Sequence, residues 1–155
     1  VEKKWICFSP GIVPAINLCT LAYTDPGDSI IVQPPVYFPF FSAVKSHGRK
    51  LIYNQLIEDD GRWVMDFDSL IASIDEKTKM IIISNPHNPI GRVWTHEELN
   101  RLAEICLNNN IIILSDEIHC DLILPGFEHT PMAKISDKIA ENTITCIAPS
   151  NPRRR

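Results

Sequence analysis

The stretch Met80-Ile81-Ile82-Ile83-Ser84-Asn85-Pro86-His87-Asn88-Pro89-Ile90-Gly91 joins four consecutive apolar residues to a loop rich in asparagine and proline. An apolar run without polar alternation is typical of a strand that is buried on both faces. The loop predicts a turn, because proline fixes φ and asparagine tolerates turn conformations. We therefore expect a buried strand of a parallel sheet, with the polar loop at its carboxyl end.

Similar short apolar runs recur along the chain and predict further strands, at residues 29–32, 51–53, 111–114 and 143–147. Helical patterns lie between them, at residues 14–22, 39–47, 67–74 and 95–109. Thr95 and Glu98 form a T-x-x-E capping box, and Asp66 is the expected N-cap of the helix at 67–74. This alternation predicts an α/β fold, a three-layer α/β/α arrangement around a mostly parallel sheet.

The composition indicates one domain with a sizeable core, since 45% of the 155 residues are hydrophobic and 22% are charged. The net charge of −4 argues against a nucleic-acid partner, because the basic residues cluster only at Arg153-Arg154-Arg155. No apolar run reaches the roughly 18 to 20 residues needed to span a bilayer, and the first residues lack a signal-peptide layout. We expect a cytoplasmic protein without a membrane segment.

The five cysteines are odd in number and show no C-x-x-C spacing: Cys7, Cys19, Cys106, Cys120 and Cys146. Their positions, mostly inside apolar segments, predict buried, reduced thiols. The nearest approach to a metal-ligand cluster is Asp116, His119 and Cys120, which lacks the paired ligands of a zinc site. We expect no metal there.

Three polar segments follow predicted strands, at residues 33–37, 84–91 and 115–119. The carboxyl ends of parallel strands meet at one edge of a sheet, so these segments should lie together. Asp116 follows four aliphatic residues, and a carboxylate at the end of a buried strand is costly unless a cation or N–H group meets it. It either faces a cationic ligand group, such as a protonated ring nitrogen, or caps the following turn.

The other candidate segments each have a plainer interpretation when taken alone. The two asparagines of N-P-H-N-P are ordinary turn residues, although the prolines would also present their amides rigidly to a ligand. Tyr37 could stack on a planar ligand or pack on the surface. Residues 9–14, S-P-G-I-V-P, could offer free N–H groups to an anion at a helix start, but their single glycine makes the signal weak.

Taken in order, these segments resemble a known family. The sequences S-P-G-I-V-P-A-I, D-P-G-D-S-I-I-V-Q-P-P-V-Y-F-P-F, N-P-H-N-P-I-G-R-V-W, S-D-E-I-H-C-D-L and T-I-T-C-I-A-P-S resemble the large domain of fold-type I pyridoxal-phosphate (PLP) enzymes. They are most similar to the MalY/PatB group of cystathionine β-lyase-like C–S lyases, in the class I/II aminotransferase superfamily. The resemblance covers residues 5–150 and is most specific at N-P-H-N-P-I-G-R-V-W with D-E-I-H.

The resemblance implies roles around the cofactor ring and the substrate. Asp116 matches the aspartate that pairs with the pyridine nitrogen and keeps the ring an electron sink. Tyr37 matches the aromatic residue stacked on the ring. Asn88 matches the asparagine that bonds the O3′ atom of the ring and helps hold the substrate carboxylate, so Tyr37 and Asn88 are also the expected substrate-binding residues.

The resemblance also implies contacts to the rest of the cofactor. His119 stands near the expected O3′ position, where many relatives have tyrosine. The backbone N–H groups of Ile12 and Val13 match the phosphate-binding turn, and Ser150 is a weaker phosphate-side candidate. The other histidines have no claim from a motif and are expected to be surface or loop residues: His47, His87, His96 and His129.

The sequence departs from the family after Ser150. The family has a lysine there whose amine forms a Schiff base with the cofactor, and Asn151 cannot do so because an amide nitrogen is not nucleophilic. We expect residues 1–150 to be an incomplete PLP-binding large domain and 151–155 a tail foreign to the family. The N-terminal segment and the small C-terminal domain of relatives, which supplies a substrate-binding arginine, are expected to be missing, and the chain should not catalyse as written.

The resemblance implies β-elimination from cystathionine or other cysteine-type thioethers, which yields pyruvate, ammonia and a thiol. The alternative is transamination, which uses the same carbanion and the same residues. A second alternative is a non-catalytic, regulatory contact with a protein partner. The resemblance also implies a small-molecule amino-acid substrate, and because relatives are homodimers, a homodimer is expected of the intact parent.

Overall fold

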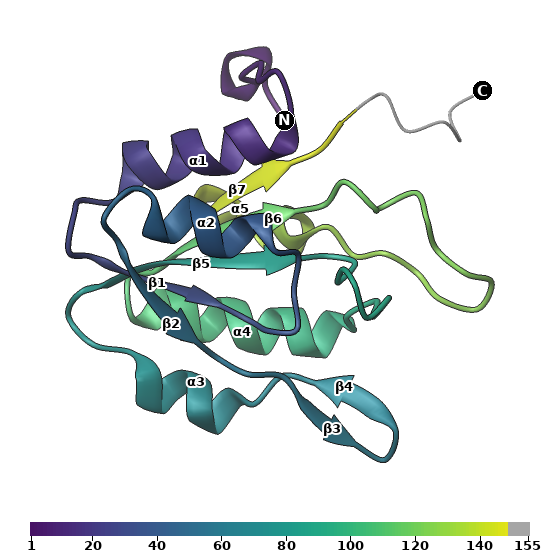
Figure 1. Ribbon diagram of the computed structural model, residues 1–155. Helices are drawn as coiled ribbons and strands as arrows, with labels where there is room; N and C mark the ends of the chain where they lie inside the picture. Colours follow the sequence, from purple (N-terminus) through teal and green to yellow (C-terminus); the bar gives the residue numbers. More distant parts are fainter. Residues whose placement is uncertain (149–155) are drawn as a thin grey trace.

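The computed structural model describes residues 1–148, which form a parallel sheet flanked by helices (Figure 1). Within these residues a five-stranded sheet has the order β2-β1-β5-β6-β7, and every neighbouring pair is parallel. Its strands are β1 (Ser29–Val32), β2 (Lys50–Tyr53), β5 (Thr78–Ser84), β6 (Ile112–Asp116) and β7 (Thr143–Cys146). The predicted α/β class and parallel sheet are confirmed.

Helices cover both faces of the sheet, as the alternation of side chains along β5 shows. Met80 and Ile82 pack in one apolar cluster with residues of α1 (Ile12–Tyr23) and α2 (Pro39–Lys45). Ile81 and Ile83 pack in a second cluster with residues of α3 (Phe67–Ser73), α4 (His96–Asn108) and α5 (Asp137–Glu141). Because successive strand residues point to opposite faces, a strand covered on both sides is apolar throughout. This is the predicted three-layer arrangement.

The helix boundaries follow local capping chemistry. Glu98 N–H donates to Thr95 Oγ1 (3.2 Å) and Thr95 N–H donates to Glu98 Oε2 (2.7 Å), which completes the predicted capping box of α4. Ser69 N–H donates to Asp66 Oδ1 (2.9 Å), as predicted for α3. Helix α1 begins two residues before the predicted start, because Pro14 fits in a first helical turn, where its missing N–H costs nothing.

The sequence patterns missed an antiparallel hairpin of β3 (Ile57–Asp59) and β4 (Arg62–Val64). Its turn residues Asp60 and Gly61 both have positive φ, 47° and 72°, as a tight hairpin turn requires. They also missed α5 and two short 3₁₀ helices, η1 (Lys3–Trp5) and η2 (Met132–Lys134). The hairpin strands are mostly exposed, so no apolar alternation marked them.

The cysteine prediction holds only in part. Cys106 and Cys146 are buried, but Cys19 and Cys120 are half-buried and Cys7 is exposed, which corrects the expectation of buried thiols for those positions. Cys7 lies in an extended segment before α1, outside both apolar clusters. As for membrane association, none of the helices within residues 1–148 is both long and apolar enough to span a bilayer.

Candidate active site

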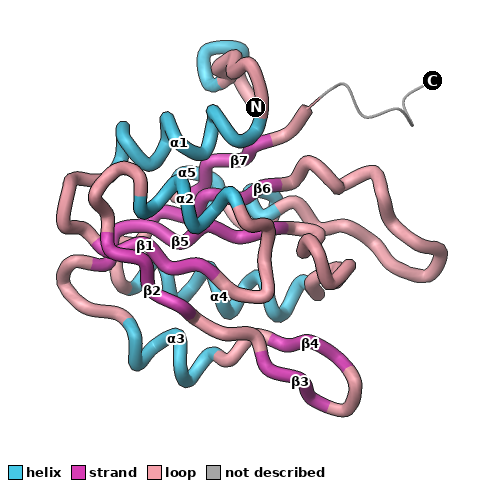
Figure 2. Tube along the Cα trace, viewed as in Figure 1, coloured by secondary structure: helices cyan, strands magenta, loops and turns pink. Residues whose placement is uncertain are grey.

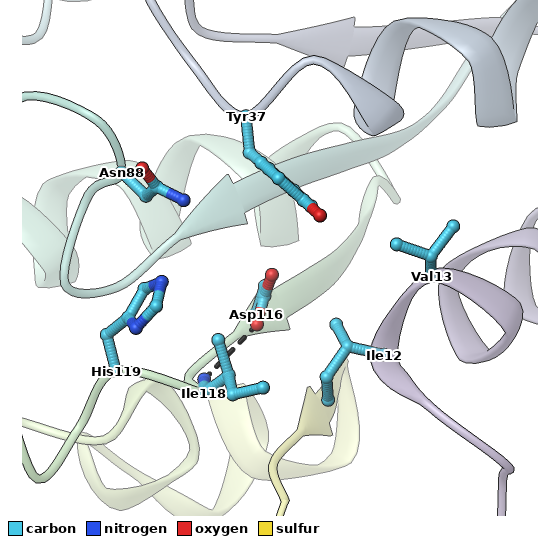
Figure 3. A pocket seen from close by; sticks show the side chains of 7 residues that line it. All are labelled: Ile12, Val13, Tyr37, Asn88, Asp116, Ile118 and His119. Carbon is cyan, nitrogen blue, oxygen red and sulfur yellow. Dashed lines mark hydrogen bonds between the residues drawn. The ribbon is translucent and has the colours of Figure 1, made fainter.

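The carboxyl edge of the sheet carries the loops that the sequence analysis singled out. Figure 2 shows these loops at the ends of β1, β5 and β6, with the start of α1 nearby. A cavity of about 320 Å³ lies among them (Figure 3). Its lining residues are Ile12, Val13, Tyr37, Asn88, Asp116, Ile118 and His119. The structure therefore brings together the six predicted site residues that it describes, while Ser150 and Asn151 lie outside the described residues.

Asp116 ends β6 and is only 4% exposed. Burial raises the pKa of its carboxyl group to about 6, and the negative charge of Glu117 adds to this effect. The N–H group of Ile118, which donates to Asp116 Oδ1 (3.2 Å), and the nearby His119 oppose the rise only partly. Asp116 thus caps the following turn, as one alternative proposed, and still faces the cavity with its charge incompletely compensated.

Ile118 is the cavity residue that sequence reasoning missed. Its side chain lines the cavity in Figure 3, and its backbone N–H group donates to Asp116 Oδ1. An isoleucine after a strand belongs to no motif that would mark it as a site residue.

Tyr37 and Asn88 enter the cavity from two different loops. In Figure 3 the Tyr37 ring points into the cavity toward the side of Asp116, and it packs edge-on against Phe40 with ring centroids 6.0 Å apart. The Asn88 backbone N–H donates to Ser84 Oγ (3.1 Å), whose hydroxyl donates to the Pro86 carbonyl (2.9 Å). These bonds tie the Asn88 loop to the end of β5.

The start of α1 closes another side of the cavity. Gly11 is the N-cap residue and provides no side-chain cap, and Pro14 has no N–H group. The backbone N–H groups of Ile12 and Val13 therefore remain as donors at the positive end of a 12-residue helix. Such a helix start can hold an anion such as a phosphate.

One histidine that was expected at the surface or in a loop is deeply buried. His87 lies in a loop, as the expectation allows, and is only 1% exposed. Burial lowers the pKa of its imidazole to about 4. His129 is half-buried and pairs with Glu117 (3.1 Å), whereas His96 is exposed. His87 and His129 contact residues in distant segments, so the periodicity of the sequence could not reveal their burial.

No three histidine, cysteine or acidic side chains gather in a metal-binding arrangement within residues 1–148. Asp116 and His119 line the cavity, but Cys120 is not among its lining residues. The polar groups that face this cavity are instead a carboxylate, an amide, a phenol, an imidazole and the N–H groups at the start of a helix. They suit an organic ligand with an aromatic ring and an anionic group.

The family model of aminotransferases of class I and II matches residues 1–148. The chain belongs to this family. It is 46% identical over 151 residues to cystathionine beta-lyase PatB of Bacillus subtilis (strain 168), which covers 97% of this chain and 39% of the relative. It is 34% identical over 127 residues to an aspartate aminotransferase of Sulfolobus acidocaldarius, covering 81% of this chain and 32% of the relative.

A solved structure extends the likeness within the aminotransferase class I and II family. Cystalysin from Treponema denticola, whose structure contains a pyridoxal 5′-phosphate cofactor, superposes with a TM-score of 0.93 and 43% identity. The match covers 97% of this chain and 38% of cystalysin. The chain spans about two-fifths of the length of these two relatives, PatB and cystalysin. The expected family and fold are confirmed.

Proposed function

We propose that the cavity binds pyridoxal 5′-phosphate and serves β-elimination on amino-acid thioethers. The observation that carries the proposal is Asp116, a carboxyl group at the end of a central strand that is 4% exposed, faces the cavity and accepts one hydrogen bond within the described residues, from Ile118. A protonated pyridine nitrogen is a cation of suitable size and planarity for this position. An ordinary structural aspartate would have its charge matched within the fold.

The other lining residues fit the remaining parts of the cofactor. The free N–H groups of Ile12 and Val13 would hold its phosphate, because a helix start combines unpaired donors with a favourable dipole. The Tyr37 ring would lie against the pyridine ring. Asn88 and His119 would donate to its phenolic oxygen, and the Asn88 amide would also reach a substrate carboxylate. These assignments were predicted from the sequence and stay proposals.

Pyridoxal phosphate, when bound, supplies a ring that accepts the electron pair left when the α-proton of an amino acid is removed. The chain's residues prepare that chemistry. Asp116 keeps the ring nitrogen protonated, because an ion pair in a buried site favours both charged forms. Tyr37 restricts the ring plane, and Asn88 orients the substrate so that its reacting bond is aligned.

Two reaction classes use this same arrangement. β-Elimination expels the sulfur group from Cβ, whereas transamination returns a proton to the cofactor. The PatB relative is named a cystathionine beta-lyase and shares 46% identity, against 34% for the aspartate aminotransferase. This difference favours a thioether substrate of the cysteine type, with pyruvate, ammonia and a thiol as products.

The 155-residue chain itself is proposed to bind the cofactor without a covalent bond. No lysine lines the cavity among residues 1–148, and Asn151 follows the A-P-S segment where the family has its lysine. An amide cannot hold the cofactor covalently or move the α-proton.

The first experiment is borohydride reduction of the chain with pyridoxal phosphate, followed by intact mass measurement and peptide mapping. The chain should bind the cofactor in an absorbance titration yet gain no reduced adduct. An Asn151→Lys variant should gain one phosphopyridoxyl group, at residue 151. An adduct at one native lysine would overturn non-covalent binding, and absence of any binding would overturn the proposed function.

A second experiment separates the reaction classes. The chain and the Asn151→Lys variant are incubated with cystathionine, or with an amino acid plus 2-oxoglutarate. The chain should release no pyruvate above a no-protein control. Pyruvate and ammonia from cystathionine with the variant would support the lyase, while formation of a new 2-oxo acid would support transamination.

The homodimer and the cytoplasmic location stay predictions for the parent protein. Support for a covered surface comes from large apolar side chains that are strongly exposed, among them Trp5 (64%), Phe8 (94%) and Phe38 (75%). The prediction of a cytoplasmic location rests on the cysteines of the sequence, which are odd in number and have no C-x-x-C spacing.

A further inference from the structure

His87 lies in the loop that carries Asn88 and contacts the loop that carries Tyr37. Its side chain is 1% exposed, and its Nε2 atom lies 3.0 Å from the Pro35 carbonyl oxygen, 52 residues away in sequence. Because a carbonyl oxygen only accepts, Nε2 carries the proton and donates it. The imidazole therefore links the loop after β5 to the loop after β1.

The ring of His87 also packs against Trp94, which restricts its orientation. It packs edge-on against Trp94, with ring centroids 5.4 Å apart and an interplanar angle of 80°. Trp94 is also 1% exposed, and its Nε1–H group donates to the Ser84 carbonyl (3.0 Å). The Arg92 guanidinium covers the Trp94 ring at 5.0 Å and pairs with Glu98 of the α4 capping box. Contacts from Glu98 of α4 to Arg92, from Arg92 to Trp94 and from Trp94 to His87 thus connect the histidine to the helix.

The backbone of His87 holds its own loop closed. Its N–H group donates to the Arg92 carbonyl (2.8 Å), and its carbonyl accepts from the Gly91 N–H group (2.8 Å). Gly91 has a φ of +70°, which favours glycine at this turn. Asn88 lies inside this closed turn, next to His87.

We propose that His87 is a positioning residue that fixes the spacing between Tyr37 and Asn88 across the cofactor cavity. The proposal rests on the proposed function, because it assigns the consequence of this spacing to pyridoxal phosphate binding. His87 does not line the cavity, so its effect passes through the two loops. Two side chains held at a set spacing lose less conformational freedom when a ligand binds between them.

The protonation state of His87 suits this role. Burial keeps the imidazole neutral near pH 7, with a pKa of about 4. Nδ1 is buried and has no hydrogen-bond partner in the described part of the chain. A neutral ring with its proton on Nε2 therefore supplies the single donor that the Pro35 carbonyl needs, and leaves no buried donor unpaired.

The test compares three variants of His87 that differ in whether their side chain can donate a hydrogen bond to the Pro35 carbonyl. The Nε2 group of glutamine can occupy the place of the imidazole Nε2, so His87→Gln keeps a donor toward Pro35. The shorter His87→Asn carries the same amide but does not reach the carbonyl, and His87→Leu has no donor. His96→Gln, at an exposed position at the start of α4, is the matched control.

Cofactor affinity is measured by absorbance titration under conditions where each variant is folded. His87→Gln and His96→Gln should bind pyridoxal phosphate within about threefold of the unmodified chain, whereas His87→Asn and His87→Leu should bind at least tenfold more weakly. Equal affinity in all four variants would overturn the positioning role. If His87→Leu does not fold, the comparison of Gln with Asn still decides.

Hydrogen exchange gives a readout that needs no cofactor. The Leu56 amide, which donates to the Pro34 carbonyl (2.8 Å), reports on one loop, and the Asn88 amide reports on the other. Both should exchange at least tenfold faster in His87→Asn than in His87→Gln, while the Leu102 amide in α4 stays unchanged. If the unmodified chain binds no cofactor, only the proposed function is overturned, and hydrogen exchange still tests the positioning role of His87. Equal exchange rates in His87→Asn and His87→Gln would overturn that role.

Discussion

Asp116 and Glu117 are adjacent carboxylates with opposite surroundings. Both are nearly fully buried, at 4% and 2% exposure. Asp116 faces the cavity and accepts one hydrogen bond, from Ile118, among the described residues. Glu117 accepts three, from Ser115 Oγ (2.9 Å), the Met132 N–H group (3.0 Å) and His129 Nε2 (3.1 Å).

The difference teaches how a strand end separates function from support. Successive side chains leave a strand in opposite directions, so one carboxylate enters the cavity and the next enters the fold. Glu117 anchors the far end of the long loop after β6, through Met132 and His129. Asp116 keeps its charge available for a ligand. We therefore interpret Glu117, which accepts three hydrogen bonds from the fold, as a structural carboxylate. Asp116 accepts only one among the described residues and is the carboxylate left for a ligand.

The largest expected effect is on stability, from removing the structural carboxylate. Glu117→Ala leaves two buried donors, at Ser115 and Met132, and the half-buried His129 without their acceptor, and should lower the free energy of unfolding by roughly 3 to 5 kcal/mol. Chemical denaturation measures this, with Glu104→Ala on the exposed face of α4 as the control. The control should change stability by less than about 0.5 kcal/mol. A loss below about 1 kcal/mol for Glu117→Ala would mean that water replaces the carboxylate.

The second prediction concerns the pH dependence of stability at Asp116, whose pKa is raised from 3.8 to about 6. The folded chain holds this proton to higher pH than the unfolded chain, so ionisation destabilises the fold as the pH rises from about 4 to 6. Asp116→Asn removes that cost. The variant should match the cofactor-free chain near pH 4 and exceed its stability by about 3 kcal/mol above pH 6.

Comparing these two proteins at each pH also cancels the contribution of His87. Its lowered pKa acts in the opposite sense, because stability is lost as the pH falls from 6.5 toward 4. Both proteins carry His87, so this loss is common to them. A constant difference between the variant and the unmodified chain across this pH range would contradict the raised pKa of Asp116.

The sequence patterns predicted Asp116 but not the surroundings of Glu117, for a physical reason. An apolar run followed by S-D-E locates the end of a buried strand, and strand ends meet at one edge whatever the rest of the chain does. Two of the three partners of Glu117 lie 12 and 15 residues further on, at His129 and Met132, beyond a loop without periodicity. Which donors reach a carboxylate across such a loop depends on how the whole loop packs.

The same reason explains the other successes and failures. Capping at Thr95 and the strand at 29–32 involve residues close in sequence, and both were predicted correctly. The burial of His87 depends on Trp94 and on the Pro35 loop, so the sequence around it did not indicate that it is buried. The Asp60-Gly61 pair is typical of a hairpin turn, but its three-residue strands are too short to show the apolar alternation that predicts a hairpin.

The third prediction concerns the contribution of Asp116 to cofactor affinity. Asp116→Asn should weaken pyridoxal phosphate binding by about 10- to 100-fold near pH 8, because a hydrogen bond to a charged group contributes roughly 1.5 to 3 kcal/mol. Absorbance titration measures the affinity. Asp68→Asn, at an exposed position of α3, should bind as the unmodified chain does. Unchanged affinity in Asp116→Asn would remove the observation on which the proposed function rests.

The smallest expected effect tests how Glu117 shares its donors. His129 meets only Oε2, while Oε1 keeps its bonds from Ser115 and Met132. His129→Leu should therefore cost about 1 to 2 kcal/mol of unfolding free energy, and His129→Gln, whose amide can still donate, less than about 1 kcal/mol. In a double-mutant cycle with Glu117→Gln, the coupling energy should be measurable for His129→Leu, which loses the bond to Oε2. It should be small for His129→Gln. Equal losses for Leu and Gln would show that the histidine contributes packing, and that Glu117 is held through its other oxygen.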